Sequence, residues 1–161
     1  MKAGHFSPDI QEFLRILAQY EAKYLIVGGE AVIYYGHARL TGDLDIFFER
    51  SPENVLKLYQ GLQDFWGGTV PGIERPEELL PEGRVVQFGV PPNRIDLINS
   101  IDGVDFASAW RNRVIEHVVM KKKRIEIYFI GLKQLIQNKQ TVGRPQDLAD
   151  LEFLRKIEPP L

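Results

Sequence analysis

The stretch YLIVGGEAVIYYGHARLTGDLDIFF, residues 24–48, contains the pattern that decides the fold. Its first four residues form an apolar run that ends at a glycine pair, which predicts a short buried strand. Residues 30–35 follow that pair and predict a short helix. A loop then leads into residues 43–48, where acidic and apolar side chains alternate before two phenylalanines, and this predicts a second strand.

Asp43 and Asp45 are the residues of this stretch that point to chemistry. Residues two apart on a strand project from the same face of the sheet, so the two carboxylates are expected to lie side by side. Placing both there costs solvation free energy and sets like charges against each other unless a cation lies between them. The spacing therefore predicts a cation site, and an exposed edge or turn is the alternative.

The rest of the chain alternates helical and strand-like segments. Ser7-Pro8 and Ser51-Pro52 are N-cap signatures that precede apolar residues at helical spacing. Further elements are expected as helices at residues 104–111, 132–139 and from 145 onward (with Leu148, Leu151 and Leu154 inward), one helical turn at 77–80, and strands at 84–90, 94–98, 116–120 and 124–129. We expect an α/β (α+β) fold in one domain, residues 1–161: a small mixed sheet with helices packed on it and a C-terminal helical pair.

The composition excludes several classes of protein. The 161 residues include 20 basic and 22 acidic side chains, so the net charge of -2 gives no overall attraction to nucleic acid or anionic membrane. The absence of cysteine excludes disulfides, thiolate metal sites and cysteine nucleophiles. The N-terminus lacks the apolar run of a signal peptide, and no apolar run is long enough to span a bilayer. We expect a cytoplasmic protein with no membrane partner.

A third acid, Asp96, lies between apolar residues in another expected strand. Aspartate is disfavoured in strands, so three such residues suggest a shared reason. If this strand pairs with the one that carries Asp43 and Asp45, all three carboxylates face one point. Mg2+ or Mn2+ takes such oxygen ligands and keeps positions open for phosphate, and Asp96 could also accept a proton from an attacking hydroxyl. An ion pair with Arg94 or Arg124 is the alternative for Asp96.

Gly28-Gly29 and the loop before Asp43 are candidates for contacts to phosphate. Backbone N–H groups at a strand end that opens a helix can hold phosphate, because no side chain blocks close approach. A tight turn is the simpler interpretation of a lone glycine pair. On the loop, the guanidinium of Arg39 and the hydroxyl of Thr41 could contact phosphate, and a solvated Arg39 is equally compatible with the sequence.

Taken together, Val27-Gly28-Gly29, Asp43-Leu44-Asp45-Ile46 and Asp96 in RIDLI resemble the signature of the nucleotidyltransferase superfamily related to DNA polymerase beta. The resemblance implies the nucleotidyltransferase fold, with the three acids as catalytic metal ligands and the glycine pair as phosphate contacts. Two departures are present. Many relatives carry serine where this chain has Gly29, and Glu30 then places a negative charge near the expected triphosphate.

The C-terminal segment LKQLIQNKQTVGRPQDLADLEFL resembles the end of small bacterial and archaeal nucleotidyltransferase-like proteins, including the abortive-infection toxin type. In these a lysine, a following arginine and an Asp-Leu-x-Asp run recur, and here they are Lys139, Arg144, Asp147 and Asp150. By this resemblance Lys139 and Arg144 are expected to bind the nucleotide. A local ion pair of Arg144 with Asp147, which fastens the last helix, is the alternative.

The resemblance implies a metal-dependent enzyme that transfers a nucleoside monophosphate from NTP, such as ATP, to an unidentified acceptor and releases pyrophosphate. A protein, an RNA and a small molecule all stay open as the acceptor. A non-catalytic nucleotide-binding module on the same fold is the alternative that Glu30 favours. A further alternative is a partner in a toxin–antitoxin pair, bound to an antitoxin or to a second copy of the chain.

Lys121-Lys122-Lys123-Arg124 is the one basic cluster in the sequence. It could meet an RNA or DNA acceptor. Lysines at a hairpin turn more often keep a strand edge soluble, and from the sequence we favour that interpretation.

Overall fold

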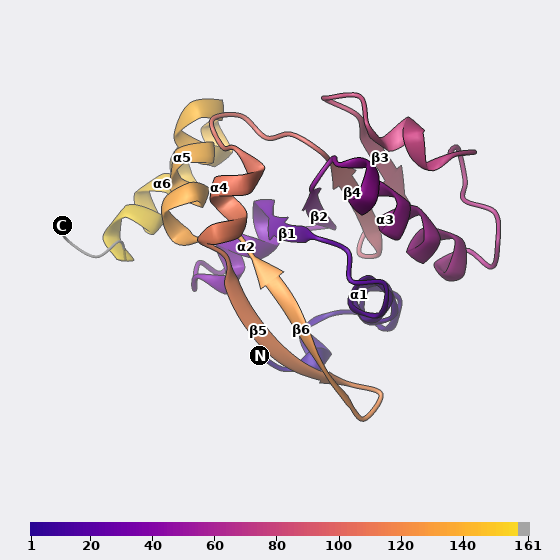
Figure 1. Ribbon diagram of the computed structural model, residues 1–161. Helices are drawn as coiled ribbons and strands as arrows, with labels where there is room; N and C mark the ends of the chain where they lie inside the picture. Colours follow the sequence, from indigo (N-terminus) through magenta and orange to yellow (C-terminus); the bar gives the residue numbers. More distant parts are fainter. Residues whose placement is uncertain (158–161) are drawn as a thin grey trace.

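The computed structural model describes residues 1–157 of the chain (Figure 1). Its α-helices are α1 (Pro8–Gln19), α2 (Gly28–Tyr34), α3 (Pro52–Phe65), α4 (Phe106–Arg111), α5 (Leu132–Val142) and α6 (Pro145–Ile157). Its strands are β1 (Tyr24–Val27), β2 (Asp43–Phe48), β3 (Val85–Phe88), β4 (Arg94–Ile98), β5 (Val114–Met120) and β6 (Lys123–Phe129). Short 3-10 helices are η1 (Ala3–His5) and η2 (Pro76–Leu79). None of the helices in this described part is long and apolar enough to cross a membrane.

The strands of residues 1–157 form one mixed sheet in the order β3-β4-β2-β1-β6-β5. At its centre β1 is antiparallel to β2, while β2 is parallel to β4 and β1 is parallel to β6. The outer pairs, β3 with β4 and β5 with β6, are antiparallel hairpins. The expected mixed sheet with packed helices and a C-terminal helical pair is confirmed, and the strand order places β2 and β4 side by side.

Helices cover both faces of this sheet (Figure 1). On one face α1 and α3 bury their apolar stripes in a cluster that includes Ile46 of β2. On the other face α2, α4, α5 and α6 pack in a cluster that includes Phe47. Because neighbouring residues of a strand project from opposite faces, Asp43 and Asp45 lie on the same face as Phe47. The acids therefore face the layer that contains α2 and the C-terminal helices.

Serine caps begin both helices of the first layer. The Oγ of Ser7 accepts a hydrogen bond from the N–H of Ile10 at 3.4 Å, and the Oγ of Ser51 accepts one from the N–H of Asn54 at 3.1 Å. A proline occupies the first turn of each helix, where its missing N–H leaves no intrahelical bond unmade. Both predicted N-caps are confirmed.

The ends of three other α-helices differ from the prediction. Helix α2 covers Gly28–Tyr34 and not residues 30–35. Helix α4 begins at Phe106 and not at residue 104, because the carboxylate of Asp105 caps it by accepting a hydrogen bond from the N–H of Ser108 at 3.1 Å. Helix α5 runs on to Val142, and Gly143 ends it with a φ of 67°. The ends of β3, β5 and β6 shift by one or two residues, which is within the usual uncertainty of such boundaries, and the other three strands have the predicted bounds.

Helix α6 turns a different face inward from the one predicted. Leu151 and Leu154 are buried as expected, but Leu148 is 56% exposed. The acids Asp147 and Asp150 occupy the buried side and are 1% and 0% exposed. The prediction of an inward Leu148 is wrong because cationic partners from outside the helix compensate the burial of the two acids.

Candidate active site

Asp43 and Asp45 of β2 and Asp96 of β4 meet at one point of the sheet. The two strands are parallel neighbours, and their register sets Asp45 opposite Asp96 and Asp43 opposite Arg94. One carboxylate oxygen from each acid lies within 4.8 Å of the other two. The fold thus brings together three acids that lie on two separate segments of the sequence.

Asp45 occupies the least favourable position of the three. Burial, followed by the negative charges of Asp43 and Asp96, raises the pKa of Asp45 to about 7. Lys139 and Arg94 act in the opposite direction without offsetting these effects. A raised carboxyl pKa means that the surroundings disfavour the ionised form of the carboxyl group.

The donor set fits a hard divalent cation. All three groups are carboxylates, which Mg2+ and Mn2+ accept as ligands, and small side-chain rotations bring oxygens at this spacing to a shared ion. Metals that prefer thiolate ligands have no such donor here, since the chain contains no cysteine. A cation at this point would offset the negative charges of Asp43 and Asp96, which act together with burial to raise the pKa of Asp45.

Arg94 holds Asp96 through a two-point hydrogen bond. Its Nε donates to Oδ1 of Asp96 at 3.0 Å, and its Nη2 donates to Oδ2 at 2.9 Å. The same Nη2 lies 3.9 Å from Oδ2 of Asp43. Hydrogen bonds to Asp96 raise the pKa of Arg94 in turn. The ion pair considered as an alternative for Asp96 is therefore present, within the acidic cluster and not in place of it.

Gly28 makes room for Asp45. Strand β1 ends at Val27, which pairs with Asp45, and Gly28 follows with a φ of 64° as the first residue of α2. A side chain at Gly28 would overlap the carboxylate of Asp45, and a Cβ at Gly29 would lie 2.7 Å from Oγ1 of Thr41. The glycine pair therefore packs directly against the acidic cluster and the loop before it, and both positions require the absence of a side chain.

Thr41 and Arg39 both point inward from the loop before β2. The hydroxyl of Thr41 donates to Oδ1 of Asp43 at 3.2 Å. The Nε of Arg39 lies 3.4 Å from Oδ1 of Asp150, and its Nη2 would lie 3.2 Å from a Cβ at Gly29. Arg39 is thus held in an ion pair and not solvated, with the far end of its guanidinium beside the glycine pair.

Lys139 lies in a buried cluster of ion pairs that joins α5 to α6. Its Nζ is 3.1 Å from Oδ1 of Asp147 and 3.1 Å from Oδ2 of Asp150, and its side chain is 5% exposed. Arg144 donates from Nε to Oδ2 of Asp147 at 2.8 Å, while its own side chain is 71% exposed. The local ion pair of Arg144 with Asp147, considered as an alternative from the sequence, is present.

This buried cluster borders the three acids of the strands. The charge of Lys139 acts on Asp45, and the charge of Asp45 acts on Arg144. Burial works to raise the pKa of Asp147, but hydrogen bonds from Arg144 and Lys139 outweigh it and hold that pKa below its usual range. Lys139 and Arg144 are therefore electrostatic neighbours of the acidic site, although their direct partners are the acids of α6.

Glu30 is paired with a histidine from the N-terminal segment. Its Oε2 lies 2.7 Å from Nε2 of His5. Both residues line a cavity of about 160 Å3 together with Thr41 and Asp43. The carboxylate of Glu30 is thus directed toward His5 at the margin of the acidic cluster. Sequence reasoning missed His5, because it is 25 residues from Glu30 and no periodicity relates the two.

Comparison with known proteins places this site in a family. No curated protein matches the chain significantly. A family model described as a nucleotidyltransferase of unknown function matches residues 8–155, which include the acidic cluster, the glycine pair and the ion pairs of α5 and α6. That description agrees with the mixed sheet and with the order of the glycine and acidic motifs along the chain. The chain belongs to the nucleotidyltransferase family of unknown function called DUF6036.

Proposed function

We propose that this protein transfers a nucleoside monophosphate from NTP to an acceptor and releases pyrophosphate, with Mg2+ or Mn2+ held by Asp43, Asp45 and Asp96. The observation that carries the proposal is the meeting of these three carboxylates within 4.8 Å of one another. Membership of a nucleotidyltransferase family supports the class of reaction. A purely structural role would not need three mutually repelling acids at one point.

The metal would be held by carboxylates that are already fixed in place. Thr41 donates to Asp43, and the register of β2 with β4 fixes Asp45 beside Asp96. Such prior ordering limits the reorganisation of Asp43 and Asp45 when the substrate binds. When bound, the ion would neutralise phosphate charge and make the α-phosphorus easier to attack.

The triphosphate would lie against the glycine pair. Gly28 and Gly29 would present backbone N–H groups to phosphate oxygens, because neither carries a side chain that blocks the approach. Arg39 would add its guanidinium from the same side, next to Gly29. Arg144 is exposed enough to contact phosphate directly, whereas the buried Lys139 would contribute through its positive charge.

Asp96 would accept the proton of the attacking hydroxyl. The acceptor oxygen gives its proton to Asp96 and bonds to the α-phosphorus, while the bond to the bridging oxygen breaks and pyrophosphate leaves. Arg94 must first release an oxygen of Asp96. Its side chain is 35% exposed, which leaves it room to turn toward the departing phosphates.

A nucleotide-binding module without transfer activity is the second candidate. The observation that favours it is the two-point hydrogen bond of Arg94, which engages both oxygens of Asp96. An arginine that stayed there would neutralise the acids in the way that a metal otherwise does. The two candidates differ in whether nucleotide binding requires a divalent metal.

Isothermal titration calorimetry with a non-hydrolysable NTP separates the two candidates. The transferase proposal predicts that binding requires Mg2+ and weakens at least about tenfold in Asp43→Asn/Asp45→Asn, because the double variant loses two metal ligands. Binding of equal strength in EDTA and in Mg2+ would favour the non-catalytic module. A folded protein that binds no NTP with either Mg2+ or Mn2+ contradicts both candidates.

A further inference from the structure

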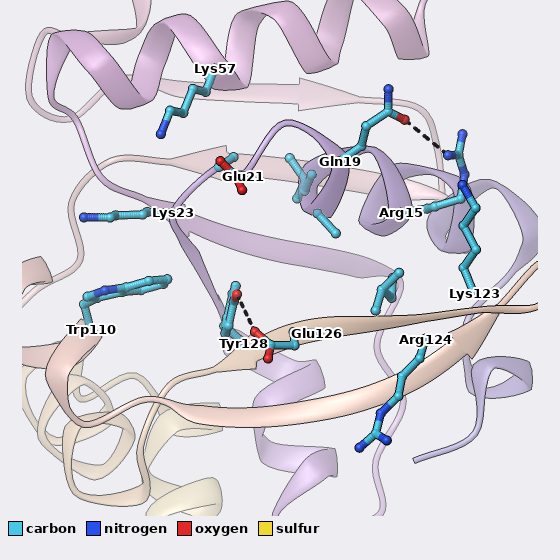
Figure 2. A pocket seen from close by; sticks show the side chains of 14 residues that line it. Arg15, Gln19, Glu21, Lys23, Lys57, Trp110, Lys123, Arg124, Glu126 and Tyr128 are labelled. Atoms are coloured by element: carbon cyan, nitrogen blue, oxygen red, sulfur yellow. Dashed lines mark hydrogen bonds between the residues drawn. The ribbon is translucent and has the colours of Figure 1, made fainter.

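A groove at the far end of β1 takes no part in the proposed transfer. It has a volume of about 650 Å3 and lies between the C-terminal part of α1, the start of β1, α4 and β6 (Figure 2). The glycine pair follows the other end of β1, and the strand has four residues. At about 3.3 Å per residue, the two sites are about 13 Å apart along the strand.

This groove is basic although the chain as a whole is slightly acidic. The cations that line it are Arg15, Lys23, Lys57, Lys123 and Arg124, and the acids are Glu21 and Glu126. Arg15 and Lys57 have acidic partners on their own helices, and Nζ of Lys23 lies 3.9 Å from Oε2 of Glu49. Lys123 and Arg124 are exposed, and within residues 1–157 neither forms an ion pair. Lys123 points toward α1 and can meet an anionic ligand in the groove, whereas Arg124, its neighbour on the strand, points away from α1 (Figure 2).

The β5–β6 hairpin brings its basic turn to this groove. The turn residues Lys121 and Lys122 have positive φ values of 49° and 65°. The Nζ of Lys121 lies 2.9 Å from Oε2 of Glu12 on α1. This contact anchors the turn beside the helix that forms one wall of the groove. The lysine cluster therefore belongs to a formed surface, which the sequence alone did not indicate.

Aromatic side chains form the other end of the groove. The rings of Trp110 and Tyr128 meet edge to face with centroids 5.1 Å apart. The guanidinium of Arg113 lies 3.9 Å from the centroid of the Trp110 ring, and Nζ of Lys23 lies 5.8 Å over the same ring. In Figure 2, Lys23 and Trp110 lie one above the other at one end, and the basic end of β6 lies at the opposite end.

Glu21 lies between these two ends of the groove (Figure 2). It is exposed, and in the described part of the chain its carboxylate has no hydrogen-bond or ion-pair partner. A carboxylate repels phosphate but accepts hydrogen bonds from the exocyclic amino groups of cytosine and adenine. A ligand that suits the whole groove therefore combines negative charge at its ends with amino-bearing aromatic groups between them.

We propose that this groove binds single-stranded nucleic acid with amino-bearing bases, independently of the proposed nucleotidyl transfer. The cations at both ends would contact phosphates, Trp110 would stack on a base, and Glu21 would accept from a base amino group. The bases of a duplex are stacked and paired with one another, so they are not free for these contacts. An acidic peptide would satisfy the cations but would leave Glu21 without a partner.

Fluorescence anisotropy with the end-labelled 12-mers (CA)6 and U12 tests the proposal. Each probe is used as RNA and as the corresponding DNA, at 50 and 200 mM salt. We expect (CA)6 to bind saturably as RNA, as DNA or as both, and U12 to bind at least about threefold more weakly. The Lys23→Glu/Lys123→Glu variant, which reverses one cation at each end of the groove, should lose at least about tenfold in affinity. The slope of log K against log salt should fall by about 1.4, since each lost phosphate contact removes about 0.7.

A matched control separates the groove from total charge. The Arg155→Glu/Lys156→Glu variant makes the same charge change at two exposed residues in the last turn of α6, and we expect it to retain the wild-type affinity. Glu21→Gln should remove the preference for (CA)6. Asp45→Asn should bind as wild type does, so failure of the proposed transfer leaves this proposal intact.

Three results would overturn the proposal. The first is an equal loss of affinity in the two double-charge variants, which would show unspecific attraction. The second is equal binding of (CA)6 and a polyglutamate of the same charge, which would point to an acidic peptide as the partner. The third is no binding of any single strand at 50 mM salt by a protein whose circular dichroism shows it to be folded.

Discussion

Asp45 and Gly28 share one small volume of the molecule. The carboxylate of Asp45 lies where a side chain at Gly28 would be, and the left-handed φ of Gly28 turns the chain away from it. The two sequence motifs are therefore halves of one physical contact. This explains why the glycine pair and the acids together predict the site, whereas either motif alone is weak evidence for it.

Replacing Asp45 by asparagine should stabilise the metal-free protein at high pH. Folding raises the pKa of Asp45 from 3.8 to about 7, so the folded protein binds this proton more strongly than the unfolded chain does. The free energy of unfolding therefore falls as the pH rises from about 4 to about 7. Asparagine is neutral throughout. Asp45→Asn should therefore raise the free energy of unfolding by roughly 1–3 kcal/mol at pH 8 and change it little at pH 4.

Urea denaturation in EDTA at the two pH values measures this effect. Asp102→Asn, which removes an exposed acid in a turn, is the control and should change little at either pH. A loss of stability in Asp45→Asn at pH 8 would contradict the electrostatic description of the site.

Alanine at Gly28 should damage the site by more than its backbone penalty. Gly67 has a similar φ of 73°, but a Cβ there meets nothing within 4 Å. Gly67→Ala should thus cost only the left-handed penalty of roughly 1–2 kcal/mol. Gly28→Ala adds the overlap with Asp45 and should cost about 3 kcal/mol or more. Mg2+ should also raise the free energy of unfolding of this variant less than it does for the wild type. Equal losses in urea denaturation would show that the contact with Asp45 is unimportant.

At the scale of elements, the pairing of α5 with α6 depends on charges that neither helix could bury alone. Lys139 of α5 lies between Asp147 and Asp150 of α6. Arg39 reaches Asp150 from the loop before β2, so the same cluster connects the C-terminal helices to the loop of the acidic site. The packing of α5 and α6 on the sheet and the position of the loop before β2 therefore depend on the same ion pairs.

Lys139 and Arg144 should differ sharply in what they contribute to stability. Lys139→Met leaves buried acids without their cation and should cost roughly 3–5 kcal/mol. Arg144→Met makes the same substitution at a side chain that is 71% exposed, and it should cost less than about 1 kcal/mol. Guanidinium denaturation at pH 7 compares the two variants. A larger loss in Arg144→Met would mean that the ion pairs are misassigned.

Local pattern predicted the elements better than it predicted their contacts. Strand alternation was enough to place Asp43 and Asp45 on one face, and serine with proline marked the starts of α1 and α3. Leucine spacing failed in α6, because burial of Asp147 and Asp150 depends on a lysine of another helix. Such compensation depends on tertiary contacts that helical periodicity does not record.

At the scale of the whole molecule, strand order assembles the candidate site. The sequence suggested that Asp96 could join Asp43 and Asp45 only if their strands paired, and parallel pairing of β2 with β4 brings this about. The 45 residues from 49 to 93 separate the two strands, so no local signal could set this register. The contact of Arg39 with Asp150 was unpredictable for the same reason.

The central claim is metal-dependent nucleotidyl transfer at Asp43, Asp45 and Asp96. The most direct test is to follow a radioactive phosphorus label from NTP in the presence of Mg2+. NTP labelled at the α-phosphorus or at the γ-phosphorus is incubated with the protein and a cell extract that supplies protein, RNA and small-molecule acceptors. We predict that the α-label passes to an acceptor while the γ-label leaves as pyrophosphate, and that Asp45→Ala or EDTA reduces the transfer at least about 100-fold. Transfer of the α-label at an unchanged rate in Asp45→Ala would contradict the account.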